Sequence, residues 1–313
     1  MVGTMLISTP LPRKFRTLLR SNVARKILHI IFASDTEPRK WVFITGCYNS
    51  GTTLLAKILE ADSRINTLPG EGVRYTAELT RPEDIGWTRM WCKCVNYVTM
   101  SASAQPQKAK LLRRDWSLFY TKSGTINLEK SIVSVPRMPW INANFDNAWF
   151  VGIIRCPFAV SKGIQRRAKP VNAAGAPELT EYTMEMAAEQ WTVANETLAK
   201  HASNLANSAI VTYEDLIESP VETVQAIYRA IGETPPALEF KNGTLSVAGV
   251  ALKINTDENK KRQDSLLSED RAAVTAIVKA SPVQSMLTAH GISNYISVDG
   301  TDNSGRATLK DSV

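Results

Sequence analysis

The segment from Gly46 to Thr53, which reads Gly-Cys-Tyr-Asn-Ser-Gly-Thr-Thr, constrains the fold of this 313-residue chain more than any other. It follows an apolar run at Trp41–Ile44 and precedes apolar residues spaced for one helical face, namely Leu54, Leu55, Ile58 and Leu59. Two glycines five positions apart between a strand and a helix have the spacing of a nucleotide-binding P-loop. In such a loop, backbone N–H groups and the N-terminus of the following helix face an anion. We therefore predict an anion-binding unit made of a strand, a loop and a helix.

The loop lacks two features of a phosphoryl-transfer site. Thr52 stands where the P-loop pattern has lysine, and none of the strands that we predict ends in a clear aspartate that would help to hold magnesium. Kinase and ATPase chemistry are therefore disfavoured. A glycine-rich turn that binds nothing is the alternative, but the strand before it and the helix after it favour an anion site.

Further apolar runs predict the rest of the sheet. We expect buried strands at Ile132–Val135, Ala148–Ile154 and Ala209–Thr212, and helical periodicity is clear in residues 184–198 and 221–231. Strands that alternate with helices are typical of a parallel sheet. The prediction is an α/β fold of the P-loop type, with a central parallel sheet between two layers of helices.

Composition divides the chain into three parts. Residues 41–297 are predicted to form one α/β domain, and residues 298–313, rich in Ser, Thr, Asp and Gly, a flexible tail. Residues 1–40 hold eight Lys and Arg residues and two acidic residues, so they carry +6 of the net charge of +7. Within them, residues 11–33 predict a basic amphipathic helix. We prefer a helix packed on the domain, and a patch attracted to anionic lipid is the alternative.

Other features bound the compartment and the partners. No apolar stretch approaches the ~20 residues that span a bilayer, and the N-terminus lacks the order of a signal peptide, so we expect a cytoplasmic protein, peripheral to a membrane at most. The chain shows no interleaved basic and aromatic motif of a nucleic-acid binder. Free thiols and no metal site are expected from the spacing of the four cysteines, Cys47, Cys92, Cys94 and Cys156.

Three motifs carry a family resemblance. Ser50-Gly51-Thr52-Thr53-Leu54 resembles the 5′-phosphosulfate loop of sulfotransferases that use 3′-phosphoadenosine 5′-phosphosulfate (PAPS). Ile154-Arg155-Cys156-Pro157 is similar to their second signature, and Tyr213-Glu214-Asp215-Leu216 to a third segment. The pattern looks closest to the tyrosylprotein sulfotransferase branch, because Gly70-Glu71 follows the first helix and Lys130-Ser131 precedes the second signature.

This resemblance implies a donor site for PAPS that releases 3′-phosphoadenosine 5′-phosphate (PAP) and needs no metal. The residues that it implicates in binding the nucleotide are Asn49, Ser50, Gly51, Thr52, Thr53, Arg155, Ser161, Arg167, Tyr213, Ser246 and Lys261. Two positions depart from the family pattern. Asn49 stands where a basic residue is usual and Gly163 where a serine is usual, and we take Ser161 as a replacement for that serine.

Transfer of a sulfuryl group to a hydroxyl needs a proton acceptor and positive charge on the leaving oxygen. None of the three histidines, His29, His201 and His290, lies beside a motif, and with the resemblance this points to Glu71 as the general base. Lys130 is the candidate for neutralising the bridging oxygen. We expect an acceptor hydroxyl on a carbohydrate of a polysaccharide or glycolipid. Protein tyrosine, a small alcohol or phenol, and a non-catalytic nucleotide-binding module remain alternatives.

Overall fold

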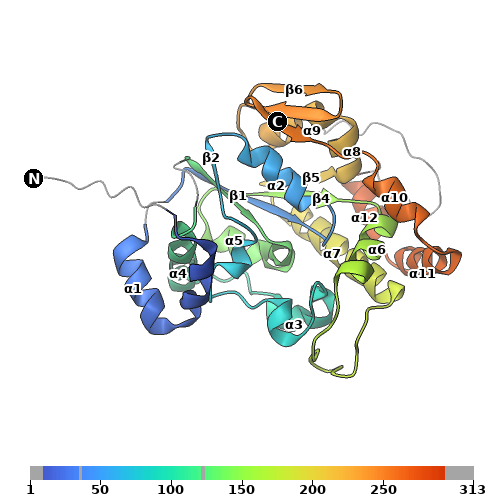
Figure 1. Cartoon of the computed structure of the whole chain (residues 1–313), viewed down its shortest axis with the longest axis horizontal. Coiled ribbons are helices and arrows are strands. Elements are labelled where there is room, and N and C mark those ends of the chain that lie inside the picture. Colours follow the sequence, from blue (N-terminus) through green and yellow to red (C-terminus); the bar gives the residue numbers. More distant parts are fainter. Residues whose placement is uncertain (1–9, 35–36, 121–123, 293–313) are drawn as a thin grey trace, which may run out of the picture.

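The computed structural model describes residues 10–34, 37–120 and 124–292. Its centre is a five-stranded sheet with the order β2-β3-β1-β4-β5, in which every neighbouring pair is parallel (Figure 1). The strands are β1 Lys40–Gly46, β2 Ile65–Thr67, β3 Ile126–Lys130, β4 Ala148–Ile154 and β5 Ser208–Thr212. The predicted α/β fold with a central parallel sheet is confirmed, and three of the four predicted strands occur where they were expected.

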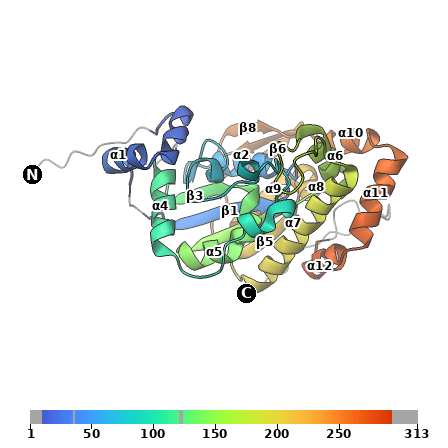
Figure 2. The same ribbon diagram turned by 90° about the horizontal axis from the view of Figure 1, so that it is seen from below.

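Alternation along β1 divides the hydrophobic core into two layers. Trp41 and Phe43 pack on one face of the sheet, and Val42 and Ile44 pack on the other. The first face is covered by α4 Pro106–Ser117, α5 Met138–Asn144, α6 Pro157–Arg167 and α7 Met184–Asn204. The second is covered by α2 Thr52–Glu60, α8 Tyr213–Glu218 and α9 Pro220–Ala230, so that helices flank the sheet on both sides (Figure 2).

The remaining elements lie around this framework. A small antiparallel sheet packs on the second layer and consists of β6 Leu238–Lys241, β7 Thr244–Val247 and β8 Val250–Lys253. The C-terminal helices are α10 Glu258–Asp264, α11 Ser268–Lys279 and α12 Val283–Ala289, and α3 Val95–Val98 is a single turn. Short 3-10 helices are η1 Arg13–Arg20, η2 Gly72–Arg74, η3 Pro82–Ile85, η4 Trp91–Cys94 and η5 Ile132–Arg137.

The strand predicted at Ile132–Val135 is wrong, because these residues form the 3-10 helix η5. All six residues of η5 are buried, and an apolar run that is buried on every side does not distinguish a strand from a buried helix. The real strand, β3, precedes it. Asn127 and Glu129 alternate there with Ile126 and Leu128, and these polar residues weaken the sequence signal of the strand.

The basic segment is two helices where one was predicted. η1 ends at Arg20, and α1 covers Asn22–Phe32. Ser21 separates them in an extended conformation, and its hydroxyl accepts a hydrogen bond from the N–H of Ala24 at 3.4 Å, as an N-cap residue does. The predicted flexible tail, residues 298–313, lies outside the described residues. None of the described helices is long and apolar enough to cross a membrane.

The order of the strands places a binding crevice at β1. From β1 the chain first builds β2 and β3 on one side and then β4 and β5 on the other. In an open parallel sheet, ligands bind at the carboxyl ends of the strands where the chain direction reverses in this way. The loop after β1 and the residues that follow β4 therefore occupy the expected position.

Candidate active site

The loop after β1 is curled by two glycines with positive φ. Gly46 has φ 150° and Gly51 has φ 103°, and a Cβ atom at Gly51 would lie 2.5 Å from Cδ2 of Tyr213. Ser50 closes the turn, because its hydroxyl donates to the carbonyl of Cys47 at 2.7 Å. Helix α2 then begins at Thr52, so the unpaired N–H groups of its first turn adjoin the loop. This geometry is that of an anion-binding loop.

Arg155 lies buried at the end of β4, against the loop. Its Nη1 donates to the carbonyl of Asn49 at 3.0 Å, and its Nε donates to Oδ1 of Asn259 at 2.6 Å. The guanidinium carbon lies 3.9 Å from the centroid of the Tyr213 ring, which is a cation–π contact. Burial lowers the pKa of Arg155, and the positive charge of Arg262 lowers it further. A negative ligand would relieve both effects.

Several buried polar atoms in this region, Oη of Tyr48 and Oε2 of Glu214 among them, have no hydrogen-bond partner among the described residues, and three belong to predicted nucleotide-binding residues. These three are Nη2 of Arg155, Nδ2 of Asn49 and Oγ of Ser161. A buried polar atom without a partner costs free energy and calls for an explanation such as a ligand. Each of these three atoms can donate a hydrogen bond. Together they fit a ligand rich in anionic oxygens, and all three belong to residues that the sequence predicts to bind the nucleotide.

The two departures from the family pattern lie next to each other. Asn49 has φ 63°, a left-handed conformation that asparagine tolerates better than most residues, and its Oδ1 accepts from Nη1 of Arg167 at 3.4 Å. A Cβ atom on Gly163 would lie 3.0 Å from Cγ of Asn49 and only 2.6 Å from Nη1 of Arg262. The missing side chain at Gly163 therefore makes room for Arg262.

Arg262 reaches this position from α10. Its Nη1 donates to the carbonyl of Ala159 at 3.3 Å, while Nε and Nη2 bind Glu258. Burial lowers the pKa of Arg167, and the charges of Arg262 and two further arginines lower it more, so positive charge is concentrated here. Arg262 is not among the residues predicted from the sequence. The adjacent Lys261 is, but it is exposed on α10 and its role stays a prediction.

Glu214 and Asn259 form a chain of hydrogen bonds that ends at Arg155. Glu214 is buried and accepts from the N–H of Cys156 at 3.0 Å and from Nδ2 of Asn259 at 2.7 Å. Burial raises the pKa of Glu214 to about 7. Asn259 thus bridges this carboxyl group and the guanidinium of Arg155. Glu214 stands inside a recognised motif, whereas nothing in the sequence singled out Asn259.

Glu71 and Lys130 form a pair near the same edge of the sheet. Nζ of Lys130 lies 3.4 Å from Oε1 of Glu71, and Nε of Arg74 lies 3.6 Å from its Oε2. Lys130 is the last residue of β3, whereas the strand predicted at Ile132–Val135 would have placed it just before the start of a strand. It pairs in register with Ile44 of β1, two residues before Gly46. This correction brings Lys130 to the carboxyl edge, beside the loop.

Glu129, buried next to Lys130, fixes the segment that carries Glu71. Its Oε1 accepts from the N–H of Gly72 at 2.8 Å and from the hydroxyl of Ser131, and its Oε2 accepts from Ser134 at 3.2 Å. Burial raises the pKa of Glu129 to about 7. Glu129 is not among the predicted site residues, because a glutamate inside a strand gives no sequence signal of such a role.

The other predicted residues are less closely tied to Arg155. Thr52 is buried at the start of α2, and Thr53 is exposed. Ser246 lies in β7, paired with Glu239 and Ala251, and no described contact brings it to the loop. Tyr75, which follows the Glu71 segment, lies in the core, with its ring centroid 4.9 Å from that of Phe119.

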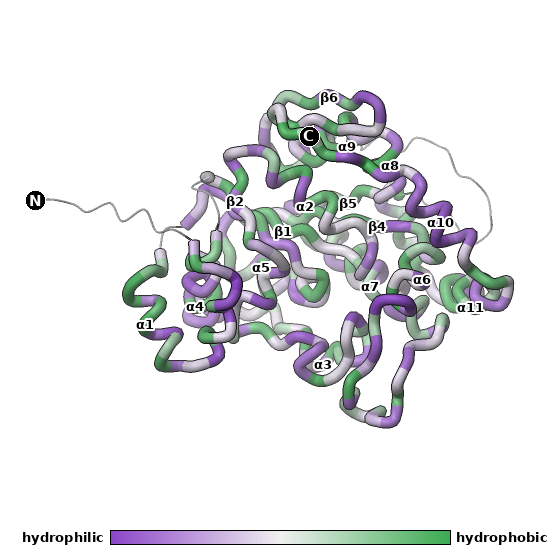
Figure 3. Tube along the Cα trace, viewed as in Figure 1, coloured by the Kyte–Doolittle hydropathy of each residue, from purple (hydrophilic) through white to green (hydrophobic). Residues whose placement is uncertain are grey.

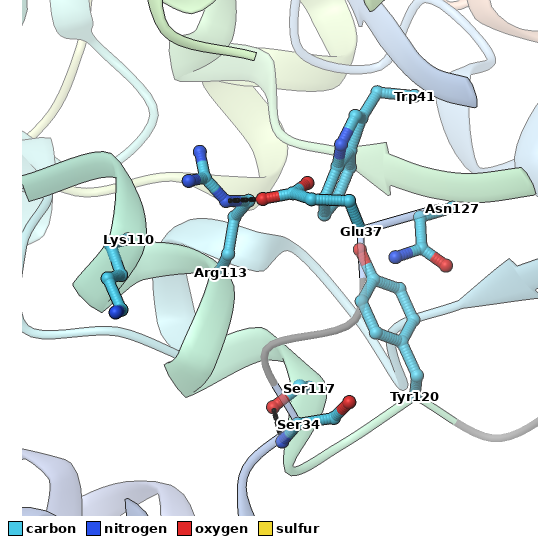
Figure 4. Close-up of a pocket in the computed structure, with 8 residues that line it drawn as sticks. All are labelled: Ser34, Glu37, Trp41, Lys110, Arg113, Ser117, Tyr120 and Asn127. Carbon is cyan, nitrogen blue, oxygen red and sulfur yellow. Dashed lines mark hydrogen bonds and ion pairs between the residues drawn. The ribbon is translucent and has the colours of Figure 1, made fainter. Parts of the chain in front are cut away.

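A separate hollow of about 230 Å³ lies at the opposite edge of the sheet. Figure 4 shows its lining, which includes Trp41 at the start of β1, Asn127 at the start of β3, and Arg113 paired with Glu37 at 2.5 Å. Because it adjoins the amino ends of the strands, this hollow is distinct from the anion site. Among the described residues, no three His, Cys, Asp or Glu side chains are grouped to hold a metal ion.

Comparison with protein families decides the class of the protein. A model described as the sulfotransferase family matches residues 42–236, which is more than half of the chain. The chain belongs to the sulfotransferase family. The matched part of this sulfotransferase includes the loop, Arg155 and Tyr213, and it ends before Asn259 and Arg262.

Solved structures similar to this sulfotransferase are distant in sequence. One is the sulfotransferase domain of the Synechococcus olefin synthase, with 16% identity, a TM-score of 0.47, and 79% of this chain and 96% of that chain covered. A second is sulfotransferase STF1 of Mycobacterium tuberculosis, with 16% identity, a TM-score of 0.47 and 87% and 80% covered. A third, a mouse sulfotransferase complexed with PAP, has 16% identity, a TM-score of 0.36 and 78% and 69% covered. No curated protein matches the chain, and the likeness to the tyrosylprotein branch stays a prediction.

Proposed function

We propose that this sulfotransferase moves the sulfuryl group of PAPS to a hydroxyl group of a carbohydrate. The observation that carries the proposal is the group of three unpartnered buried polar atoms on Asn49, Arg155 and Ser161 beside the curled loop. They offer hydrogen bonds to an anion, and the rest of the site adds positive charge. A nucleotide that carries a phosphosulfate and a second phosphate would use both features.

The donor half of the site has a role for each group. The loop and the N-terminus of α2 would hold the phosphosulfate, because their N–H groups suit tetrahedral anions. Arg155 would bind the 3′-phosphate, since a guanidinium matches phosphate oxygens in pairs. Arg167 and Arg262 add charge nearby, and the ring of Tyr213 would lie near the adenine.

The chemical step needs two charged groups of this chain. The acceptor oxygen forms a bond to sulfur while the bond between sulfur and the bridging oxygen of the phosphate breaks, and the hydroxyl proton goes to the carboxylate of Glu71. Lys130 would stabilise the negative charge that develops on the bridging oxygen. PAP and a sulfate ester are the products. The contact of 3.4 Å between Lys130 and Glu71 keeps the two groups close before the substrates bind.

The surroundings of Glu71 support a polar acceptor. Arg74 contacts Glu71 and also Glu83, at 3.3 Å, so charged side chains surround the proposed base. A carbohydrate, with many hydroxyl groups, offers hydrogen-bond partners to such a surface, whereas a phenol would favour apolar contacts. We therefore rank a carbohydrate before tyrosine or a small phenol.

The test begins with the donor. Isothermal titration with PAP and with ATP should show binding selective for PAP, and Arg155→Ala should weaken PAP binding by about 30-fold or more, as expected for a lost charged hydrogen-bond network. Preference for ATP would overturn the proposal.

The second stage measures turnover. PAPS is supplied with oligosaccharides, a tyrosine peptide and simple phenols as acceptors. We expect sulfation of an oligosaccharide, which Glu71→Gln should slow at least about 100-fold while PAP binding stays within about twofold. Glu83→Gln is the matched control, because it removes a neighbouring carboxylate that does not contact Lys130. Binding of PAP without turnover on any acceptor would indicate a non-catalytic module.

A further inference from the structure

Helix α1 turns its charged side inward and its aliphatic side outward. Arg25 and His29 are buried, whereas Val23, Ile27, Ile30 and Ile31 expose 71%, 51%, 83% and 57% of their surface. At 3.6 residues per turn, these four aliphatic residues share one face of the helix. A surface helix of a soluble domain normally shows the opposite arrangement. Figure 3 shows α1 at the edge of the molecule, with hydrophobic stretches in green.

Buried ion pairs hold α1 in this orientation. Nε and Nη2 of Arg25 donate to the two oxygens of Asp115, at 2.8 and 2.7 Å, and Nη1 donates to Glu78 at 2.6 Å. Nε2 of His29 lies 2.8 Å from Oδ1 of Asp115, a carboxylate that is completely buried. Rotation of the helix to hide its isoleucines would break these contacts. The aliphatic face is therefore fixed outward.

Positive charge is dense in η1 and α1, the two helices of this segment, which pack against each other. Residues 10–34 contain six Lys and Arg residues and no Asp or Glu. Apart from Arg25, which is buried, and Arg20, which pairs with Asp84 at 3.1 Å, these cations are the exposed residues Arg13, Lys14, Arg16 and Lys26. Basic residues beside an exposed aliphatic face are typical of helices that lie in the interface of a membrane.

We propose that this face is a docking surface for an anionic phospholipid bilayer. The α1 surface, as we call it, consists of the aliphatic residues Val23, Ile27, Ile30 and Ile31 and the cations Arg13, Lys14, Arg16 and Lys26. The aliphatic side chains enter the boundary between headgroups and acyl chains, and the cations contact lipid phosphates. A second copy of the chain is a poorer partner, because two α1 surfaces would bring like charges together. The proposal does not depend on the reaction that the enzyme catalyses.

Vesicle binding by the full chain tests the proposal. The protein is sedimented with vesicles of phosphatidylcholine alone or of phosphatidylcholine mixed with phosphatidylglycerol. We expect binding to the mixed vesicles, with weaker binding as salt concentration rises. The double variant Ile27→Ser/Ile30→Ser should bind them at least about tenfold more weakly, and Arg13→Gln/Lys14→Gln several-fold more weakly, because the first loses buried apolar area and the second loses charge.

Controls separate docking from folding and from self-association. Val171→Ser removes an aliphatic residue that is 65% exposed in the segment between α6 and α7, and it should leave vesicle binding unchanged. The melting temperature of each variant and its affinity for PAP report whether the fold is intact. Equal vesicle binding by the wild type and by Ile27→Ser/Ile30→Ser would overturn the proposal. So would a wild-type dimer that ignores vesicles and that the same double variant converts to a monomer.

Discussion

Arg262 occupies the space that a side chain at position 163 would need. Its Nη1 lies 2.6 Å from the point where a Cβ atom on Gly163 would stand. The two residues are 99 positions apart in the sequence and meet because α10 packs against α6. A glycine in the middle of α6 costs stability relative to most other residues, so its presence indicates a need for space. Arg262 uses that space and places its positive charge close to Asn49, which stands where a basic residue is usual in the family.

Gly163→Ser, which restores the residue usual in the family, should weaken PAP binding about tenfold. The new Cβ atom displaces Arg262 from the anion site, although the helix itself gains about 0.5 kcal/mol from the better propensity of serine. Isothermal titration measures the affinity, and thermal unfolding measures the helix effect. In an Arg262→Ala background the same serine should cause no further loss of affinity. Tighter PAP binding by Gly163→Ser would contradict this account.

The ring of Tyr213, rather than its hydroxyl group, should matter for donor binding. The ring lies under the guanidinium of Arg155, whereas the hydroxyl reaches only the carbonyl of Asn255, at 3.5 Å. Tyr213→Phe should therefore keep PAP affinity within about twofold, and Tyr213→Ala should lower it about tenfold by removing the cation–π contact. Titration calorimetry on the two variants checks this. Similar affinities for the phenylalanine and alanine variants would show that the ring contributes little.

The sequence was sufficient for the framework of the site. The strand, loop and helix at residues 41–60 and the strand that ends before Arg155 are visible as apolar periodicity and glycine spacing, which are local features. The polar groups that complete the site come from distant segments. Asn259 and Arg262 lie about 100 residues after Arg155, in a helix with no recognisable motif. Only the packing of α10 on α6 shows that they belong to the site.

Burial explains the other differences. η5 and α1 differ from the prediction in opposite ways. The prediction assumes that apolar residues pack inward and that they do so in a regular strand or helix. Ile132 and its neighbours are buried on all sides without forming a strand, and Ile30 faces solvent on a helix whose arginine is buried. The partner of that arginine, Asp115, lies 90 residues away, so the orientation of α1 could not be read from local sequence.

Glu129 and Glu214 should make the protein less stable as the pH rises from about 4.5 to about 7. Burial raises the pKa of both Glu129 and Glu214 to about 7, from an ordinary value near 4.5. In this window the folded state therefore holds protons that the unfolded state has released, so the free energy of unfolding decreases with pH. Each group contributes at most about 1.4 kcal/mol per pH unit.

Chemical denaturation at several pH values measures this slope. Glu129→Gln cannot release a proton and should reduce the slope by the contribution of one group. Glu178→Gln, at an exposed position, serves as the matched control and should reproduce the wild-type slope. A slope of opposite sign in the wild type, or no difference between the two variants, would contradict the assignment.

Lys130→Gln should lower kcat much more than it lowers donor affinity. Lys130 lies at the end of β3 and contacts Glu71. The unpartnered polar atoms that suggest a nucleotide site belong instead to Asn49 in the loop and to Arg155 and Ser161 after β4, which lies on the other side of β1 from β3. The charge of Lys130 is therefore needed chiefly when negative charge develops on the bridging oxygen, and a loss of about 100-fold in kcat is expected for such a group.

Steady-state kinetics with PAPS and titration with PAP separate the two effects of Lys130→Gln. Lys57→Gln, which removes an exposed cation from α2, is the control for a general loss of positive charge and should leave both quantities near the wild-type values. Comparable losses in kcat and in PAP affinity would instead make Lys130 a binding residue for the donor. Because Asn49 contributes no charge to the loop, that outcome would mean that Lys130 replaces the missing cation in binding and not in catalysis.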